Sequence, residues 1–245
     1  MVNDYKAKIK KIKDLSKTVK EFTLDLGNSL EFKAGQFVNL SFEDNGENLK
    51  RAYSIASNPE KDSNEIKLCI KLVEGGHLTP KLFEKKENDY VNIKAPLGIF
   101  TLDKVTKNKL VFIGTGTGIA PLRSMILDEI SKQKNIRDSE NEEGISENSE
   151  IVLIFGVRYE NEILYKEEFE KLAEDNPNFK YVQVISKPSD DWQGRKGHVQ
   201  DNFDMIDVNN SNVFICGLPA MFDGTKEKLI QMGMNDKDIF HEVFR

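Results

Sequence analysis

The sequence predicts two domains of different fold class: an antiparallel β-barrel over residues 1–103 and an α/β domain with a parallel sheet over residues 104–245. Three observations support this prediction. The chain of 245 residues is longer than the ~100–150 residues of a typical single domain. Its first part is a series of short strands in which polar and apolar residues alternate, and its second part has continuous apolar strands that alternate with helices.

The first part contains six short segments rich in Val, Ile, Phe and Tyr, which is the composition of strands. These strands are expected at residues 5–12, 18–26, 36–42, 51–57, 65–73 and 90–95. Turn residues such as Asn45-Gly46 and Gly75-Gly76 separate them, and a helix is expected after Gly76, where Leu78, Leu82 and Phe83 share one face. Short strands at this spacing are typical of an antiparallel barrel or sandwich.

The second part changes its rhythm near residue 104. Buried strands are expected at residues 109–114, 151–156, 180–186 and 212–217, with an amphipathic helix over 120–133. Continuous apolar strands that alternate with helices indicate a parallel sheet with helices on both faces. The acidic segment 132–150 has two isoleucines and no aromatic residue, so we expect a mobile surface loop there.

Composition excludes several classes of function. With 35 Lys+Arg against 41 Asp+Glu the net charge is −6, which disfavours nucleic acid as a partner. No apolar run approaches the ~20 residues of a membrane helix, and the N-terminal segment lacks the apolar stretch of a signal peptide. Cys69 and Cys216 fit buried thiols of a cytoplasmic protein better than a disulfide. The three histidines lack zinc-ligand spacing, so no metal site is predicted.

Three motifs carry residues suited to binding phosphate or a cofactor. Arg51-Ala52-Tyr53-Ser54 offers a guanidinium, an aromatic ring and a hydroxyl on one strand. The run from Gly114 to Pro121, GTGTGIAP, follows a buried strand and opens a helix, where free N–H groups favour a pyrophosphate. The run from Cys216 to Met221, CGLPAM, ends another buried strand. Taken singly, each also fits a structural role: a common strand composition, a tight turn, and a strand-to-helix turn.

The order of the motifs along the chain is more specific than any one of them. The chain resembles the ferredoxin–NADP reductase superfamily of flavoproteins from about residue 5 to residue 245. The motifs that carry the resemblance are, in order, RAYSIAS, GGHLT, APLGIF, IGTGTGIAP, CGLPAM and HEVF. The resemblance implies a flavin-binding barrel and a nicotinamide-nucleotide domain, with the site in the cleft between them. It implies hydride transfer between nicotinamide C4 and N5 of a bound FAD. Two cysteines cannot ligate a [2Fe–2S] cluster alone, so a reductase without an iron–sulfur domain is expected.

The resemblance assigns flavin contacts to two segments of the first domain. Arg51 would pair with the flavin pyrophosphate, Tyr53 would lie beside the isoalloxazine, and the catalytic Ser54 would place its hydroxyl near N5. The further cofactor-binding residues that it implies are Ala52, Gly76, His77, Leu78 and Thr79. Within that set, Gly76 and Thr79 match the family's G-x-x-[ST] turn.

Nucleotide contacts fall in the second domain. The resemblance implies pyrophosphate binding by Gly114, Thr115, Gly116, Thr117, Gly118 and Pro121, and nicotinamide contacts by Cys216, Gly217, Pro219 and Met221, with Cys216 also catalytic. Arg158, Lys187 and Arg195 resemble the basic cluster that grips a 2′-phosphate, so NADP(H) is expected ahead of NAD(H). Asp190 and Asp191 lie in the same loop and oppose that preference.

The C-terminal segment, from Ile239 to Arg245, has two interpretations. Its apolar residues fit a plain edge strand. Its Glu-Val-Phe run resembles the family's terminal segment, in which Phe244 would cover the flavin and control nucleotide access, while Glu242 would act in proton transfer or electrostatics. Arg245 is one residue beyond the family's usual aromatic end.

The electron partner implied by the resemblance is a separate ferredoxin or flavodoxin. Three alternatives stay open at this point: a reductase component of a multicomponent oxygenase, a free-flavin reductase, and a non-catalytic nucleotide-binding subunit. The joint presence of Arg51, Tyr53, Ser54 and Glu242 argues against the last of these.

Overall fold

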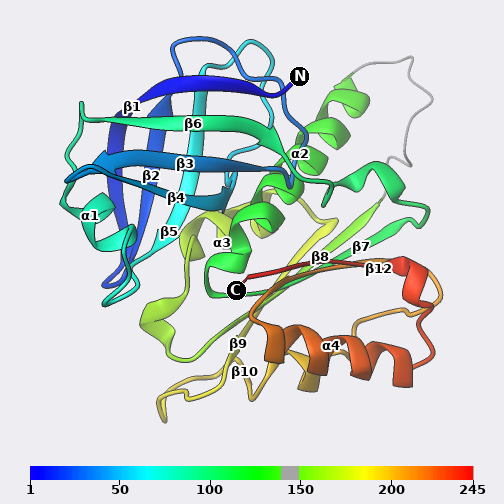
Figure 1. Cartoon of the computed structure of the whole chain (residues 1–245). Coiled ribbons are helices and arrows are strands. Elements are labelled where there is room, and N and C mark those ends of the chain that lie inside the picture. Colours follow the sequence, from blue (N-terminus) through cyan, green and yellow to red (C-terminus); the bar gives the residue numbers. More distant parts are fainter. Residues whose placement is uncertain (139–148, 245) are drawn as a thin grey trace. The chain divides into compact units, whose positions relative to one another are not determined.

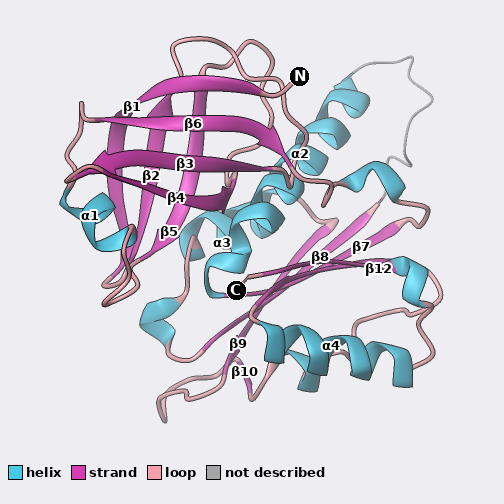
Figure 2. Cartoon of the chain, viewed as in Figure 1, coloured by secondary structure: helices cyan, strands magenta, loops and turns pink. Residues whose placement is uncertain are grey.

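Two six-stranded β-sheets organise the chain in the computed structural model, which describes residues 1–138 and 149–244 (Figures 1 and 2). Each sheet belongs to its own compact unit. The first unit comprises Met1–Leu102 together with Arg123–Leu127, and the second comprises Asp103–Leu122 and Asp128–Arg245. A short piece of one helix therefore belongs to the first unit, although the residues before and after it belong to the second.

The first sheet is antiparallel throughout and has the strand order β4-β3-β6-β1-β2-β5. Its strands are β1 (Asn3–Ser16), β2 (Val19–Asp25), β3 (Phe37–Asp44), β4 (Glu47–Ser54), β5 (Glu65–Lys71) and β6 (Tyr90–Leu97). A bridge between Ile55 and Leu68 joins the two ends of this order and closes the barrel. Helix α1 (Thr79–Glu84) follows β5, and the predicted antiparallel barrel is confirmed.

The strand predicted at residues 51–57 is displaced towards the N-terminus. Asn45 and Gly46 form the turn between β3 and β4 with positive φ values of 49° and 82°, so β4 begins at Glu47. It ends at Ser54. Beyond the bridge at Ile55, the chain leaves the sheet, and the carbonyl oxygens of Ala56 and Ser57 accept hydrogen bonds from helix α2 instead of from a strand.

The second sheet is parallel throughout and has the order β10-β9-β8-β7-β11-β12. Its strands are β7 (Lys109–Thr115), β8 (Glu150–Val157), β9 (Phe179–Ile185), β10 (Arg195–Lys196), β11 (Ser211–Gly217) and β12 (Ile239–Val243). Its helices are α2 (Ile119–Asp138), α3 (Lys166–Asp175) and α4 (Pro219–Gln231). The short β10 was not predicted, and the edge-strand interpretation of the C-terminal segment is correct for β12.

Helices cover both faces of this sheet, as β9 illustrates. On one face, the rings of Phe179 and Tyr181 lie 6.2 and 5.3 Å from the ring of Phe169 on α3. On the other face, Val184 belongs to a buried cluster with Leu229 of α4. The predicted α/β architecture is confirmed.

The predicted loop over residues 132–150 is wrong at both ends. Helix α2 continues to Asp138, and β8 begins at Glu150. Two contacts stabilise the helix where the predicted loop would begin: Lys132 pairs with Asp128 at 2.7 Å, and the buried Gln133 donates to the Ser149 carbonyl at 3.2 Å. The rest of the predicted loop, residues 139–148, lies outside the described residues.

Three further findings concern the cysteines, membrane-spanning helices and metal-binding clusters. Cys69 and Cys216 are both buried thiols, as predicted. Among the described residues, no helix is both long enough and apolar enough to cross a membrane. Within residues 1–138 and 149–244, no three His, Cys, Asp or Glu side chains lie close enough together to hold a metal ion.

Candidate flavin and nucleotide sites

Strand β4 lies at one end of the first sheet and presents Arg51 to solvent. The Arg51 Nη1 donates to the carbonyl of Lys50 at 2.9 Å, and Arg51 has no ion-pair partner among the described residues. A guanidinium has five N–H donors, so most of this one is available to an anion. The position therefore fits a residue that binds a pyrophosphate.

Tyr53 and Ser54 are anchored in the barrel. The half-buried Tyr53 ring packs against the hydrophobic core, and this burial raises the pKa of its phenol to about 12, an effect that the charge of Arg51 opposes. The phenol is therefore neutral at physiological pH. Ser54 is only 6% exposed, whereas Ala52 is exposed. The strand thus holds an aromatic ring and a hydroxyl in fixed positions beside an exposed cation.

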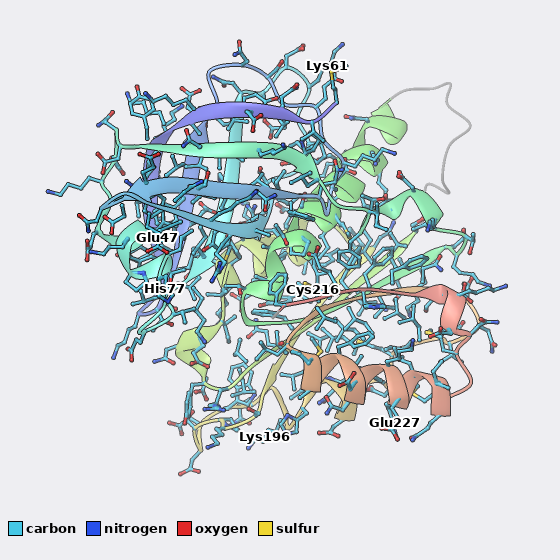
Figure 3. All side chains as sticks on the ribbon, in the orientation of Figure 1. Glu47, Lys61, His77, Lys196, Cys216 and Glu227 are labelled. Carbon is cyan, nitrogen blue, oxygen red and sulfur yellow. The ribbon has the colours of Figure 1, made fainter. Side chains whose placement is uncertain are left out.

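The turn before α1 is held closed by the side chain of Thr79. The Thr79 hydroxyl accepts from the Val73 N–H at 2.9 Å, and the Gly76 N–H donates to the Val73 carbonyl at 3.0 Å. Leu78 is 4% exposed and part of the core, so it can reach a cofactor only through its backbone. His77 is exposed on this turn (Figure 3). Thr79 acts on the shape of the turn in this structure, and its contact with a phosphate stays a prediction.

The glycine-rich loop connects β7 to α2, as predicted. Thr115, Gly116 and Thr117 are half-buried, while Gly114, Gly118 and Pro121 are buried. A Cβ atom on Gly116 would meet no atom within 4 Å, so the tip of the loop has open space beside it. Because α2 begins at Ile119, this space lies at the N-terminus of a long helix, where backbone N–H groups favour anions.

The end of β11 packs directly against this loop. A Cβ atom on Gly118 would overlap the carbonyl oxygen of Cys216 and lie 2.7 Å from its carbonyl carbon. A Cβ on Gly217 would lie 2.6 Å from the Thr115 Oγ1. The contact at Gly118 requires glycine because it is made with backbone, whereas a larger residue at Gly217 would have to displace side chains. Here, close packing of the protein against itself explains these two glycines.

The point of contact has a particular place in the sheet. Strands β8 and β9 continue the order on one side of β7, and β11 and β12 lie on its other side, so the order reverses between β7 and β11. In open parallel sheets, ligands bind at the carboxyl ends of the strands at such a reversal. The predicted pyrophosphate loop and Cys216 (Figure 3) both lie there.

Cys216 and Glu242 are register partners on β11 and β12. Burial raises the pKa of the Cys216 thiol well above its usual value, and the Glu242 carboxylate raises it further. Cys216 is therefore a neutral thiol at physiological pH. The Phe244 N–H donates to the Gly217 carbonyl at 3.0 Å, which keeps the half-buried Phe244 next to the end of β11. Arg245 lies outside the described residues.

Helix α4 begins at the end of β11. Pro219, in its first turn, is exposed, whereas Met221 packs against the core of the second unit. The methyl group of Met221 would collide with a Cβ on Gly217. The structure thus gives Met221 a packing role beside the predicted nicotinamide position.

Two of the three predicted basic residues are neighbours. The Lys187 N–H donates to the Arg158 carbonyl at 2.9 Å, and both side chains are exposed at the ends of β9 and β8. Arg195, on β10, forms two hydrogen bonds with Asp204, one of them at 2.9 Å. A phosphate at Arg195 would have to compete with this carboxylate.

Acidic residues shape the same edge of the sheet. The Glu160 carboxylate accepts from the Ser189 N–H at 2.7 Å, which lowers its pKa, and Glu162 accepts from the N–H groups of Arg158 and Tyr159 at 3.2 Å. Tyr159, a 43% exposed aromatic residue that follows Arg158 in the chain, was not predicted as a site residue. An exposed ring followed by carboxylates resembles an ordinary solvated loop in sequence.

Two family models match the chain, one for each part. Residues 6–102 match the model described as an oxidoreductase FAD-binding domain, and residues 112–227 match an oxidoreductase NAD-binding domain. Among curated proteins, ferredoxin–NADP reductase B of Sorangium cellulosum is 31% identical over 233 residues, which are 91% of this chain and 90% of that protein.

A second relative is longer than this chain. The reductase component DmpP of phenol 2-monooxygenase from Pseudomonas sp. (strain CF600) is 34% identical over 250 residues, which are 99% of this chain. The chain spans 66% of the length of that protein. The phenol hydroxylase P5 protein of Acinetobacter pittii (strain PHEA-2) is also 34% identical, over 252 residues, which are 100% of this chain and 66% of that protein.

Solved structures show the same fold. The crystal structure of the Amycolatopsis reductase GcoB has a TM-score of 0.86 and 28% identity, and the match covers 99% of this chain and 70% of that one. A ferredoxin NADP⁺ reductase from Neisseria gonorrhoeae, solved with FAD and NADP bound, has a TM-score of 0.79 and 21% identity over 99% and 98% of the two chains.

Proposed function

Since this chain belongs to the ferredoxin–NADP reductase superfamily of flavoprotein oxidoreductases, we propose that it passes electrons between NAD(P)H and a separate one-electron carrier such as a ferredoxin or flavodoxin. The observation that carries the proposal is Arg51, exposed and without an ion-pair partner among the described residues, on the strand that also holds Tyr53 and Ser54.

Bound FAD would supply the chemistry, because it accepts a hydride from a nicotinamide at N5 and releases electrons one at a time. The chain would supply binding and orientation. In this proposal Arg51 binds the flavin pyrophosphate, the neutral Tyr53 ring lies against the flavin, and the Ser54 hydroxyl hydrogen-bonds near N5. The backbone at Gly116 and Thr117 binds the nucleotide pyrophosphate at the N-terminus of α2.

Cys216 and Glu242 act as a pair in the same proposal. The buried, neutral thiol of Cys216 presents no charge to the nicotinamide ring. The neighbouring Glu242 carboxylate can hold or release a proton. Phe244, held against Gly217 by its backbone, would control how the nucleotide enters.

The nucleotide preference that we propose is NADPH over NADH. Arg158 and Lys187 support it, because their backbones are hydrogen-bonded to each other and both residues expose a cation that could attract a ribose 2′-phosphate. The test is kcat/KM for both nucleotides. A preference of tenfold or more for NADH, about 1.4 kcal/mol, would overturn this part of the proposal.

An anaerobic titration tests the function as a whole. The purified protein should be yellow, release FAD on heating, and lose its visible absorbance when NADPH or NADH is added without oxygen. Reduced protein should then reduce a ferredoxin or cytochrome c. Release of FMN, or a flavin that no nucleotide bleaches, would contradict the proposal. A colourless protein that turns over added flavin would indicate a free-flavin reductase instead.

A reductase component of an oxygenase is the second candidate. The 34% identity to a phenol 2-monooxygenase reductase component favours it, although that protein is longer than this chain. Both candidates share the flavin and nucleotide chemistry and differ in the acceptor. Electron transfer to an oxygenase component at a rate at least tenfold above that to any ferredoxin would favour the second candidate.

A further inference from the structure

One turn of helix α2 is built into the first unit. The residues of this turn, Arg123–Leu127, belong to the first unit. Arg123 is 6% exposed, and Ser124 and Met125 are completely buried. Burying a guanidinium is costly unless its N–H groups find acceptors, so the acceptors of Arg123 carry information about its role.

The two polar side chains of this turn bind consecutive carbonyls. Arg123 Nη1 donates to the Ala56 carbonyl through a short hydrogen bond, and the Ser124 hydroxyl donates to the Ser57 carbonyl at 2.6 Å. Both carbonyls belong to the segment that leaves β4 immediately after Ser54. Helix side chains therefore supply the hydrogen-bond donors for these two carbonyls.

The same segment is fixed on its other side by the barrel. The Ile55 N–H donates to the Gln36 carbonyl at 2.9 Å, and the Ala56 N–H donates to the Lys67 carbonyl at 2.8 Å. The backbone that follows Ser54 is thus held from two sides. Its N–H groups bind barrel backbone, and its carbonyls bind the helix.

We propose that Arg123 and Ser124 are positioning residues, which fix the end of β4 and thereby set where Tyr53 and Ser54 meet the flavin. This inference rests on the proposed function, in which Tyr53 and Ser54 contact FAD. Neither Arg123 nor Ser124 needs to touch the cofactor, because each acts through a backbone carbonyl two or three residues beyond Ser54.

A cavity beside Arg123 makes the proposal testable. It has a volume of about 360 Å³ and is lined by Arg123, by polar residues of the segment between β4 and β5 such as Asn58 and Glu60, and by Lys67 of β5. Glu60 is exposed and the Lys67 side chain is 41% exposed, so the rim reaches solvent. Small cations can therefore approach the position of the guanidinium.

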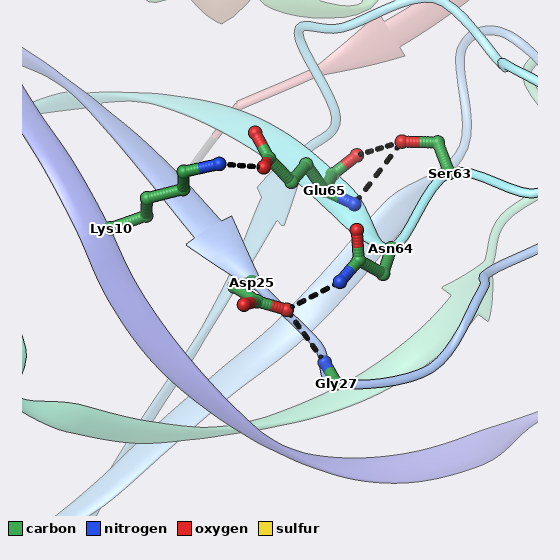
Figure 4. Close-up of polar contacts among 6 residues, drawn as sticks. All are labelled: Lys10, Asp25, Gly27, Ser63, Asn64 and Glu65. Atoms are coloured by element: carbon green, nitrogen blue, oxygen red, sulfur yellow. Dashed lines mark hydrogen bonds and ion pairs between the residues drawn. The ribbon is translucent and has the colours of Figure 1, made fainter.

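Three further residues that line this cavity, Ser63, Asn64 and Glu65, take part in polar contacts (Figure 4). Asp25 accepts from the Asn64 side chain and from the Gly27 N–H, each at 2.8 Å, and the Glu65 N–H donates to the Ser63 hydroxyl at 3.2 Å. Truncating Arg123 should leave a defined space rather than a collapsed one.

The experiment compares Arg123→Ala, Arg123→Lys and Ser124→Ala in the FAD-containing protein, with NADPH or NADH as donor and ferricyanide as acceptor. Lys132→Ala is the matched control, because Lys132 is an exposed cation on the same helix, and its ion pair among the described residues is with Asp128, four residues earlier on that helix. We expect Arg123→Ala to keep FAD but to shift its visible absorption bands and midpoint potential. Its kcat should fall roughly tenfold or more, with little change in KM, as expected for a misplaced reacting group.

Added guanidinium ions at millimolar concentration should restore much of the lost kcat and the original spectrum, whereas sodium ions should not. Ser124→Ala and Arg123→Lys should show weaker changes in the same direction. If Arg123→Ala does not fold, these two variants test the positioning role instead. Wild-type spectrum, potential and kcat in all three variants would overturn the positioning role. A wild-type protein that holds no flavin would overturn both proposals, whereas unaltered variants of a flavin-containing protein overturn only this one.

Discussion

The two candidate sites differ in which part of the residue does the binding. In the first unit, the predicted flavin contacts are side chains on a strand: the guanidinium of Arg51, the ring of Tyr53 and the hydroxyl of Ser54. In the second unit, the predicted nucleotide contacts are backbone groups, and glycines allow them to approach. The first site should therefore suffer when a side chain is shortened, and the second when one is lengthened.

The largest effect is expected from Arg51→Ala, which removes the group proposed to bind the flavin pyrophosphate. Losing hydrogen bonds to a charged phosphate costs about 1.5–3 kcal/mol, so FAD should bind roughly tenfold to a hundredfold more weakly. Equilibrium dialysis or flavin retention during gel filtration measures the change. Lys50→Ala, an exposed cation next to it, should retain FAD. Full retention by Arg51→Ala would place the flavin elsewhere.

The converse change in the second unit is Gly118→Ala, which adds a Cβ against the Cys216 carbonyl. Overpacking at a fixed contact costs about 1–3 kcal/mol, so the melting temperature should fall and nucleotide-dependent flavin reduction should slow. Gly224→Ala is the control, because its Cβ would meet only the flexible Gln200 side chain, at 3.3 Å. Equal behaviour of the two variants would contradict the close packing of loop and strand.

In the proposed function two side chains, those of Glu242 and Phe244, also belong to the second site, and variants of both sharpen the comparison. Phe244→Ala should keep FAD but alter the KM or the selectivity for the nucleotide, and Glu242→Gln should slow electron transfer. Changes of up to roughly tenfold, or about 1.4 kcal/mol, are expected. Removing the carboxylate charge should also lower the pKa of Cys216, which the ultraviolet absorbance of its thiolate can follow against pH. Unaltered steady-state kinetics in both variants would show that the C-terminal segment has no role in nucleotide binding or electron transfer.

The smallest effect concerns Glu129, a buried residue of α2 that lies just after the turn Arg123–Leu127. Burial raises the pKa of Glu129, so the folded state favours the protonated carboxyl. The free energy of unfolding therefore decreases as the pH rises from the pKa of the unfolded state to that of the folded state. Glu129→Gln removes this cost and keeps an acceptor for Gln133. Its melting temperature should match the wild type near pH 4 and exceed it near pH 8. An equal difference at both pH values would exclude ionisation as the cause.

Local patterns were enough to predict the two sheets. Alternation identified the barrel strands, Asn45-Gly46 identified a turn, and continuous apolar runs identified β7, β8, β9 and β11. The length of α2 was missed, because the buried partner of Gln133 is the Ser149 carbonyl, which lies 16 residues away. The two-residue β10 has no pattern of its own to recognise.

The site was predictable only where a motif marks it. Arg51, Gly114 and Cys216 occur in recognisable runs of sequence, whereas Arg123 and Ser124 look like ordinary polar residues of an amphipathic helix. Their acceptors are backbone carbonyls 67 residues earlier in the chain. A backbone carbonyl has no residue identity, so no local pattern in the sequence could have predicted the contact.

The inclusion of Arg123–Leu127 in the first unit bears on how the protein is made. Chains emerge from the ribosome N-terminus first, and domains usually begin to fold as their residues appear. The barrel strands are complete at Leu97, yet the helix turn that binds the Ala56 and Ser57 carbonyls is synthesised only 26 residues later. The glycine-rich loop is therefore already translated when the first unit receives its last piece. A nascent chain released before residue 123 should hold a barrel that is more open to proteolysis at residues 55–57 than one released after residue 127.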